Sequence, residues 1–78
     1  MVTLAVKKDA RAIRVRFEKD QLAVELADGR VLFAPLEWFP RLLKATKAQR
    51  AKVRLIAGGV GLHWSELDED ISVAGLLG

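Results

Sequence analysis

The 78-residue sequence predicts an α+β domain: a small antiparallel β-meander covered by short helices, with an added C-terminal strand and a terminal helix. Three observations predict this class. Apolar and polar residues alternate from Ala12 to Ala34 with the two-residue period of half-buried strands. An Asp28-Gly29 pair, typical of a tight hairpin, interrupts the alternation. A leucine- and aromatic-rich segment follows, and a helix there can cover the apolar face of the meander.

The meander is predicted from three consecutive alternating segments. Their inward residues are Ile13, Val15 and Phe17 in residues 12–18, Leu22, Val24 and Leu26 in residues 21–27, and Val31 and Phe33 in residues 30–34. A turn at Lys19-Asp20 joins the first two, and Asp28-Gly29 supplies the two positive-φ positions of a type I′ turn. Pro35 ends the third strand because it has no N–H to donate. Residues 2–10 are interpreted as a short strand or an arm.

The covering segment is residues 36–45, where Leu36, Phe39 and Leu43 fall at the i, i+3, i+7 spacing of one helix face. Pro40 is tolerated in the first turns of such a helix, or it divides the segment into a turn and a second helix. Trp38 points away from the apolar stripe. It is either a rim residue that closes the core or an exposed aromatic at a protein–protein contact.

A second helix is predicted from the capping box Thr46-Lys47-Ala48-Gln49 and extends to about Val53. Basic residues crowd this region, and no acid lies between Glu37 and Glu66 to balance them. The basic residues are Arg41, Lys44, Lys47, Arg50, Lys52 and Arg54. They form either a solvated face, partly neutralised by the C-terminal acids, or a phosphate-binding surface.

The charge of the chain is divided along the sequence. All thirteen Lys and Arg residues lie at or before Arg54, so residues 1–54 carry +7 and residues 55–78 carry −4 within a total of +3. Either an acidic tail folds onto a basic body, or a basic face stays free for a partner. We favour the first arrangement, because the two halves of so small a domain must share one core.

The C-terminal part begins with a predicted buried strand at residues 53–57, which Gly58-Gly59 ends. Residues 62–64 then add a short strand to the sheet, with Leu62 and Trp64 on one face and His63 on the other, as a structural or rim residue. The glycine run of residues 58–61 is not a phosphate-binding loop, because no Lys-Ser/Thr pair follows it.

An acidic motif and a terminal helix close the chain. Asp68, Glu69 and Asp70 are expected to pair with Arg41, Arg50 or Arg54, or to cap helices, and no second oxygen cluster accompanies them to complete a metal site. Ile71 is predicted to enter the core and Ser72 to cap the terminal helix. That helix carries Val73, Leu76 and Leu77, which face either the chain's own core or a second subunit.

Composition excludes several classes of function. The absence of cysteine excludes disulfides, a thiolate nucleophile and Cys-based metal sites. One His, and Ser residues without a paired base, form no nucleophilic constellation, so we expect neither an enzyme nor a cofactor. Without a signal-like N-terminus or a run of about eighteen apolar residues, a single cytoplasmic domain with no membrane partner is expected.

Motifs spread over the chain resemble those of a bacterial family, domain of unknown function 2442. They are Asp28-Gly29-Arg30, Pro35 to Leu42, Ala45-Thr46 with Arg50, Gly61 to Trp64, Leu67 to Val73 and Gly75-Leu76-Leu77. Phe39 stands where Tyr is expected. The resemblance implies a small α+β domain. It also implies a setting in which members are often encoded beside another short protein, which suggests toxin–antitoxin pairs, and some carry a DNA-binding extension that has no counterpart here.

Two functions therefore stay open. The first is a non-enzymatic protein-interaction module, such as the antitoxin-like partner of a small bacterial protein, working as a homodimer or with another protein. The second is a nucleic-acid-binding protein that uses the basic Arg41–Arg54 surface. The candidate interaction residues are Trp38, Arg41, Arg50, His63, Trp64, Asp68, Glu69 and Asp70.

Overall fold

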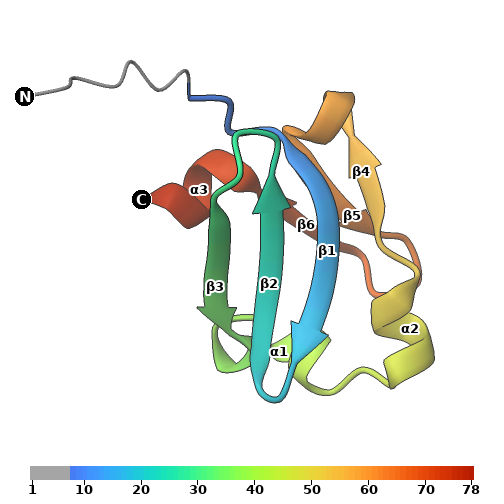
Figure 1. The fold of residues 1–78 in the computed structure, drawn as a ribbon. Coiled ribbons are helices and arrows are strands. Elements are labelled where there is room, and N and C mark those ends of the chain that lie inside the picture. The colour runs from blue at the N-terminus through green and yellow to red at the C-terminus, as the bar shows by residue number, and fades with distance from the viewer. Residues whose placement is uncertain (1–7) are drawn as a thin grey trace, which may run out of the picture.

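The computed structural model describes residues 8–78, which build two three-stranded antiparallel sheets (Figure 1). The first sheet has the order β1-β2-β3 and consists of β1 (Ala12–Glu18), β2 (Gln21–Leu26) and β3 (Val31–Pro35). The second has the order β4-β5-β6 and consists of β4 (Arg54–Ile56), β5 (Gly61–Trp64) and β6 (Glu69–Ser72). The predicted α+β class and the N-terminal meander are confirmed.

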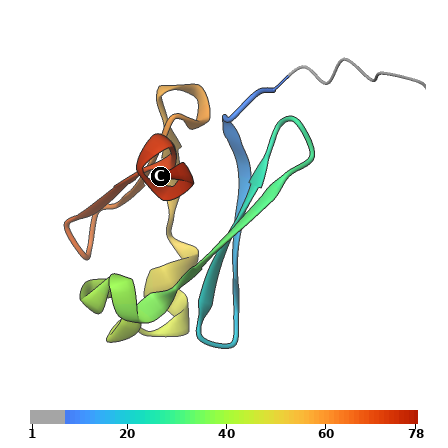
Figure 2. The same ribbon diagram turned by 90° about the vertical axis from the view of Figure 1, so that its left-hand side faces the viewer.

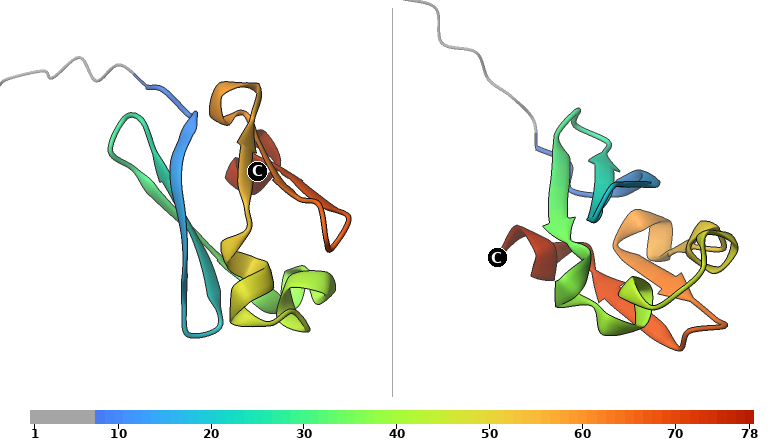
Figure 3. Two further views of the ribbon diagram at one scale, coloured as in Figure 1. Left: turned by 90° about the vertical axis from the view of Figure 1, so that its right-hand side faces the viewer. Right: turned by 90° about the horizontal axis from the view of Figure 1, so that it is seen from below.

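Short helices connect the two sheets and finish the chain. They are the 3-10 turns η1 (Leu36–Trp38) and η2 (Ala57–Gly59) and the helices α1 (Pro40–Leu43), α2 (Lys47–Ala51) and α3 (Val73–Leu77). Figure 2 and the left panel of Figure 3 show the sheets facing each other, with α1 and α2 at the end where the chain crosses between them. Helices α1 and α2 therefore close one end of the core.

The core lies between the sheets and is centred on the middle strands. Leu22, Val24 and Leu26 of β2 are fully buried, as predicted. Leu62 and Trp64 of β5 face them from the second sheet and are equally buried. The remaining core residues are Ala12, Leu36, Leu42, Ile71 and Val73, with Val15, Phe17, Leu32, Phe39, Val53 and Leu76 packed at the margin.

Ile13 is not in the core as predicted, because β1 contains a β-bulge. Ala12 pairs with Leu26 and Arg14 with the adjacent Glu25, so Ile13 is the extra residue and its side chain is 59% exposed. Ala12 is buried in its place. A bulge shifts the alternation by one residue, which strict two-residue periodicity cannot anticipate.

The predicted type I′ hairpin is also wrong. As a result, the side chains of β3 point to the faces opposite to those predicted. Leu26 donates to the Arg30 carbonyl (2.8 Å) and Gly29 to the Leu26 carbonyl (3.0 Å), and of the Asp28-Gly29 pair only Gly29 has positive φ. This is the three-residue turn that ends in a left-handed residue, not the two-residue turn. Register therefore shifts by one residue, which turns every β3 side chain to the opposite face.

The inward residues of β3 are consequently Leu32 and Ala34. Val24 pairs with Leu32 and Leu22 with Ala34. Phe33 is 50% exposed, and Val31 is exposed as well. The meander thus has aromatic and aliphatic side chains on its outer face as well as on its inner face.

Asp28 stabilises the three-residue turn through its side chain. Its carboxylate accepts hydrogen bonds from the Arg30 backbone N–H (3.1 Å), from Arg30 Nε (2.9 Å) and from the Asp9 backbone N–H (2.9 Å). These bonds, above all the one from the Arg30 side chain, lower the pKa of Asp28 to about 2. The turn is therefore tied to the segment that precedes β1.

The covering segment is divided at Pro40, which is the first residue of α1 after the η1 turn. Because of this division Leu42 is buried, while Leu43, predicted to face the core, is 45% exposed. The capping box of α2 forms as predicted between Thr46 and Gln49. That helix ends at Ala51, earlier than the predicted Val53.

The C-terminal strands form a sheet of their own rather than extending the meander. β5 pairs with β4 and β6, and the β5–β6 turn is closed by Asp68, which has φ +51° and donates to the Ser65 carbonyl. Strand β5 thus pairs with its neighbours in the sequence, β4 and β6, and not with the strands of the N-terminal meander as predicted. The strand predicted as buried at residues 53–57 is the exposed edge strand β4. The strand or arm predicted for residues 2–10 lies largely outside the described residues, and residues 8–11 contain no strand.

Gly59 lies against β1, and replacing it provides a test of how closely the two sheets approach. Its φ is +102°, and a Cβ there would lie 2.3 Å from the Ala12 carbonyl oxygen. We expect Gly59→Ala to lower the free energy of unfolding by about 3 kcal/mol or more, through overlap and backbone strain. Urea unfolding followed by Trp fluorescence measures this.

Gly58→Ala is the matched control, because Gly58 has φ +69° and no atom within 4 Å of an added Cβ. This variant should lose about 1 kcal/mol from backbone strain alone. Equal losses in the two variants would contradict the close contact between η2 and β1.

Candidate functional site

Trp64 is a structural residue at the centre of the molecule. Its side chain is 1% exposed and packs edge-to-face on Phe17 of β1, with ring centres 6.5 Å apart. The indole N–H donates to the Arg50 backbone carbonyl at 3.0 Å. One side chain therefore joins the two sheets to α2, and it is not available to a partner.

Arg50 also serves the fold. Its Nε donates to the Leu42 carbonyl (2.8 Å) and its Nη2 to the Leu43 carbonyl (2.9 Å), at the C-terminal end of α1. The Leu42 carbonyl also accepts from the Ala45 N–H (3.2 Å), and a cation beside the last carbonyls of a helix is favourable. The guanidinium also lies 5.7 Å from the centre of the Phe17 ring. Arg50 thus holds α1, α2 and β1 together.

The acidic motif does not form the predicted bidentate pairs with Arg41, Arg50 and Arg54. Arg41 reaches the motif, but it donates to the backbone carbonyl of Asp68 and not to a carboxylate. The carboxylate of Asp70 instead lies 2.5 Å from His63 Nδ1, because β5 and β6 place the two residues in register. Arg41 therefore contacts the C-terminal part through a backbone carbonyl, and the carboxylates of Asp68, Glu69 and Asp70 form no ion pair with Arg41, Arg50 or Arg54.

One ion pair does connect the basic and acidic halves of the chain within residues 8–78. Glu66 accepts from Lys52 at 2.7 Å, and both side chains are exposed. Exposed pairs of this kind contribute at most about 1 kcal/mol. The interpretation of an acidic tail folded onto a basic body is therefore correct for this contact and wrong for Asp68, Glu69 and Asp70.

His63 lies on the outer face of the second sheet, opposite to the buried Leu62 and Trp64, as predicted. Arg54 is its register partner on β4 and Asp70 its partner on β6. The side chain of Asp70 is 68% exposed. A cross-strand row of basic, imidazole and acidic groups therefore faces solvent.

Trp38 is exposed. Its position fits the interpretation as an exposed aromatic rather than as a rim residue that closes the core. Its side chain is 66% exposed, although its neighbours Leu36 and Phe39 are buried and half-buried. Beside it lies a groove of about 300 Å³. The groove residues come from η1 and its end, β6 and α3, and are Trp38, Phe39, Asp70, Ile71, Ser72, Gly75 and Leu76.

A second apolar hollow adjoins the first across β6. It has about 340 Å³ and shares Asp70, Ile71 and Ser72 with the Trp38 groove. Its other residues are Ile56, Ala57, Val60, Gly61 and Leu62. The side chain of Ile56 lies over Gly61, where a Cβ would come within 2.9 Å of it. Exposed apolar side chains thus continue from η1 over β6 to η2.

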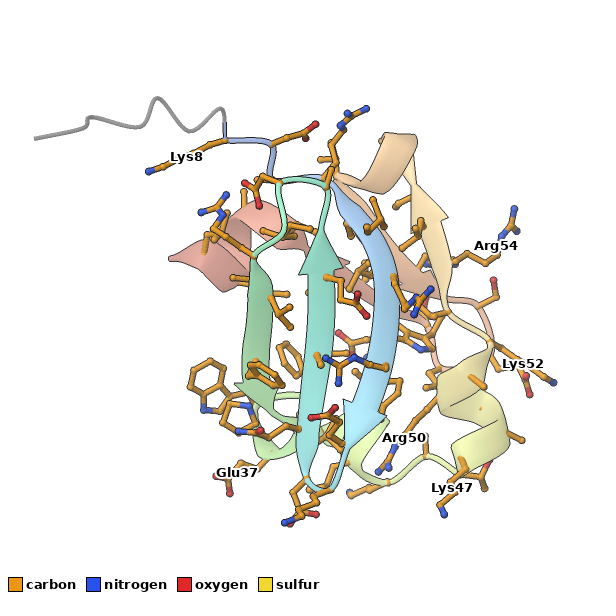
Figure 4. The ribbon with its side chains drawn as sticks, in the orientation of Figure 1. Lys8, Glu37, Lys47, Arg50, Lys52 and Arg54 are labelled. Carbon is orange, nitrogen blue, oxygen red and sulfur yellow. The ribbon has the colours of Figure 1, made fainter. Side chains whose placement is uncertain are left out.

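The basic residues gather at the opposite edge of the molecule. Figure 4 shows Lys47, Arg50, Lys52 and Arg54 along α2 and β4, whereas Glu37 lies at the other side. Phe17, Lys19, Lys47 and Arg50 line a hollow of about 420 Å³ there. The predicted concentration of charge near Arg41–Arg54 is real, but Arg41 is directed to the β5–β6 turn.

Metal ligands do not converge within the described part of the chain: residues 8–78 contain no group of three or more His, Asp or Glu side chains placed to hold an ion. Among the same residues, no helix has the length and apolar character to cross a bilayer.

Sequence reasoning identified Trp38 and Asp70 but missed most of the Trp38 groove. The sequence predicts Phe39 and Ile71 only as core residues, and it indicates Gly75 only as part of a motif that resembles the family. The signal that was present was the apolar content of the terminal helix, which left its orientation open. The groove could not be inferred because it joins segments more than thirty residues apart, which no local pattern relates.

The structure defines a class: a small α+β domain with two facing three-stranded sheets and apolar hollows on its surface. The chain belongs to a family described as "Protein of unknown function (DUF2442)", whose sequence pattern matches residues 12–78. The suspected family is thus confirmed.

A solved structure is similar to this one. It is the crystal structure of a protein of unknown function from Rhodospirillum rubrum ATCC 11170, with 32% sequence identity and a TM-score of 0.73. The similarity covers 86% of this chain and 83% of that chain. No curated protein matches the sequence.

Replacing Arg50 tests its structural role. Arg50→Ala removes two charge-assisted hydrogen bonds to α1 carbonyls and the contact with Phe17, so we expect a loss of about 2 kcal/mol of unfolding free energy. In a domain of this size that corresponds to a fall in Tm of roughly 8–16 °C.

Lys47→Ala is the control, because Lys47 is exposed on the same helix and substitution of such a residue changes stability by about 0.5 kcal/mol at most. If the two variants unfold at the same urea concentration, Arg50 does not hold α1 as described.

Proposed function

We propose that this domain is a non-enzymatic protein-interaction module. The observation that carries the proposal is the exposed Trp38 at the rim of an apolar groove. Burying an indole stabilises a complex strongly, and Trp is enriched among the residues that dominate binding energy at interfaces. In a chain that fully buries its other Trp, an exposed one supports a role in binding.

The partner we propose is a small bacterial protein, for which the domain would act as an antitoxin-like partner in the cytoplasm. The apolar surface that continues over β6 to Ile56 and Val60 supports a protein partner, because apolar hollows that join across a strand suit a large apolar contact. A homodimer would use the same surface, because Trp38, Ile56 and Val60 expose apolar side chains there.

Trp38→Glu should abolish this binding. We expect the wild-type domain, used as bait in its native host, to recover one specific protein, and a charged side chain at position 38 to reduce recovery at least about tenfold by blocking burial in the interface. Mass spectrometry of the recovered proteins measures this. Coexpression with the neighbouring small gene product tests the antitoxin-like role directly.

Phe33→Glu is the matched control: Phe33 is an exposed aromatic on the outer face of the first sheet. It should leave recovery unchanged. Equal recovery by all three baits, or no recovery by the wild type, would contradict the proposal. Light scattering of the purified domain at high micromolar concentration distinguishes a homodimer from a monomer that binds a different protein. If the domain is a homodimer, Trp38→Glu should dissociate it.

A second candidate, nucleic-acid binding, is favoured by one specific observation. The hollow between β1 and α2 combines the Phe17 ring with Lys19, Lys47 and Arg50. Cations attract phosphates, and an aromatic ring can stack on a base. Arg50 is a poor residue with which to test this, because its loss would also weaken the fold.

The double substitution Lys19→Ala with Lys47→Ala tests it instead. If the hollow binds phosphates, the plot of log K against log salt for duplex DNA should become less steep by about 2, one for each lost phosphate contact. Fluorescence anisotropy measures this slope. Lys8→Ala, far from the hollow in Figure 4, should leave the slope unchanged. Absence of binding by the wild type at low salt removes this candidate.

A further inference from the structure

The Trp38 groove runs along the outer edge of β6. Three consecutive residues of this strand, Asp70, Ile71 and Ser72, line it. The hollow beside β5 touches the same three residues, but the other residues of the Trp38 groove come from η1 and its end and from α3, and not from β4 or β5, so this groove lies at the free edge of β6. β6 is the last strand in the order β4-β5-β6, and no other strand of residues 8–78 pairs with that edge.

The hydrogen-bond pattern shows which groups of β6 point into the groove. Val73 N–H donates to the Val60 carbonyl at 3.1 Å, and the same register pairs Leu62 with Ile71. In an antiparallel pair, hydrogen-bonded and non-hydrogen-bonded pairs alternate. Ile71 therefore bonds to β5, whereas the backbone groups of Asp70 and the N–H of Ser72 point outward.

Arg41 reaches the chain just before this strand. It donates to the backbone carbonyl of Asp68, in the turn between β5 and β6. A side chain from α1 thus lies close to the start of β6. Outside the strand ladders, no backbone hydrogen bond of residues 8–78 involves the Asp70 N–H or carbonyl.

We propose that the outer edge of β6 and the Trp38 groove accept an extended segment of a partner protein, in which apolar and basic side chains alternate. The added segment would pair with the outward groups of Asp70 and Ser72, as in other cases of strand addition. This inference rests on the proposed role as a protein-interaction module and specifies how the partner binds.

The chemistry of the groove determines the alternation. On the inner side, a segment residue would contact the apolar Trp38, Phe39 and Leu76. On the outer side, its neighbour would stand across from Asp70, which is exposed, and opposite charges across strands stabilise the pair. No Lys or Arg lines the groove, and Glu69 adjoins Asp70 in the strand.

A second copy of this chain fits the edge less well than such a segment. If two β6 strands paired antiparallel with Asp70 opposite Asp70, the two Asp70 carboxylates would face each other. Like charges facing each other across strands are destabilising. A basic segment from a different protein avoids this repulsion.

The test uses a short acetylated and amidated peptide in which Lys and Ile alternate, compared with one in which Glu and Ile alternate. We expect the Lys peptide to bind at least about tenfold more tightly, by NMR titration of the ¹⁵N-labelled full chain. On binding, the amides of Asp70 and Ser72 should become slow to exchange with solvent. The Ile71 amide, already in the ladder, should change little.

Three substitutions sharpen the result. Gly75→Leu fills the groove at a helix position where an added Cβ meets only the Ser72 Cβ, at 3.8 Å, so it should weaken peptide binding at least about tenfold while the fold stays intact. Ala74→Leu, next to it but outside the groove, should not. Asp70→Lys should reverse the preference between the Lys and Glu peptides.

Each contrary outcome overturns a defined part of the proposal. Failure of both peptides to bind, or binding without protection of Asp70 and Ser72, overturns strand addition. If Trp38 still controls recovery of a protein partner in that case, the interaction module survives and only its mode of binding falls. Protection of the same two amides that rises with protein concentration in the absence of peptide would identify a second copy as the occupant and overturn the choice of partner.

Discussion

The packing of Trp64 against Phe17 is the interaction on which the rest of the structure depends. The two sheets are separate hairpin systems, and their strands share no backbone hydrogen-bond ladder. Trp64 joins them through the Phe17 contact, and its indole N–H fixes the position of α2 through the Arg50 carbonyl. Arg50 then extends from that point to the end of α1. The Trp64–Phe17 pair and Arg50 therefore connect four elements, β1, β5, α1 and α2.

The local features of the fold were predictable because they depend on neighbouring residues. The capping box at Thr46 and Gln49, the Ser72 cap and the inward face of β2 all follow from spacings within a few residues. The predictions failed where a shift of one residue in strand register determines whether a side chain points to the core or to solvent. The bulge at Ile13 and the three-residue turn at Gly29 each shift the alternation by one, which exposes Ile13, Val31 and Phe33. A tertiary contact, between Asp28 and the Asp9 N–H, supports the longer turn, and the local Asp-Gly signal does not reveal it.

Prediction of the candidate site failed for a different reason. Residue type indicated Trp38 and Asp70 as candidates, and the structure places both at one groove. Their relation to each other depends on the turn after β3 and on the pairing of β6 with β5, which bring η1 and α3 together. The sequence also suggested that charge would join the two halves of the chain. The core joins them instead, and Asp70 pairs in register with His63 and not with an arginine.

This division between residues that hold the fold and residues that do not separates structural from functional candidates. Arg50 and Trp64 are as distinctive in type as Trp38, yet their polar groups and ring faces are occupied within the molecule. Trp38 has a large exposed ring, and Asp70 has outward backbone groups on a strand edge. Exposed strand edges invite pairing with other chains, and proteins usually cover them or protect them with charge. In the strand addition that we propose, the exposed carboxylate of Asp70 would disfavour an acidic strand at this edge and favour a basic one. One acid would then oppose self-association and select a partner.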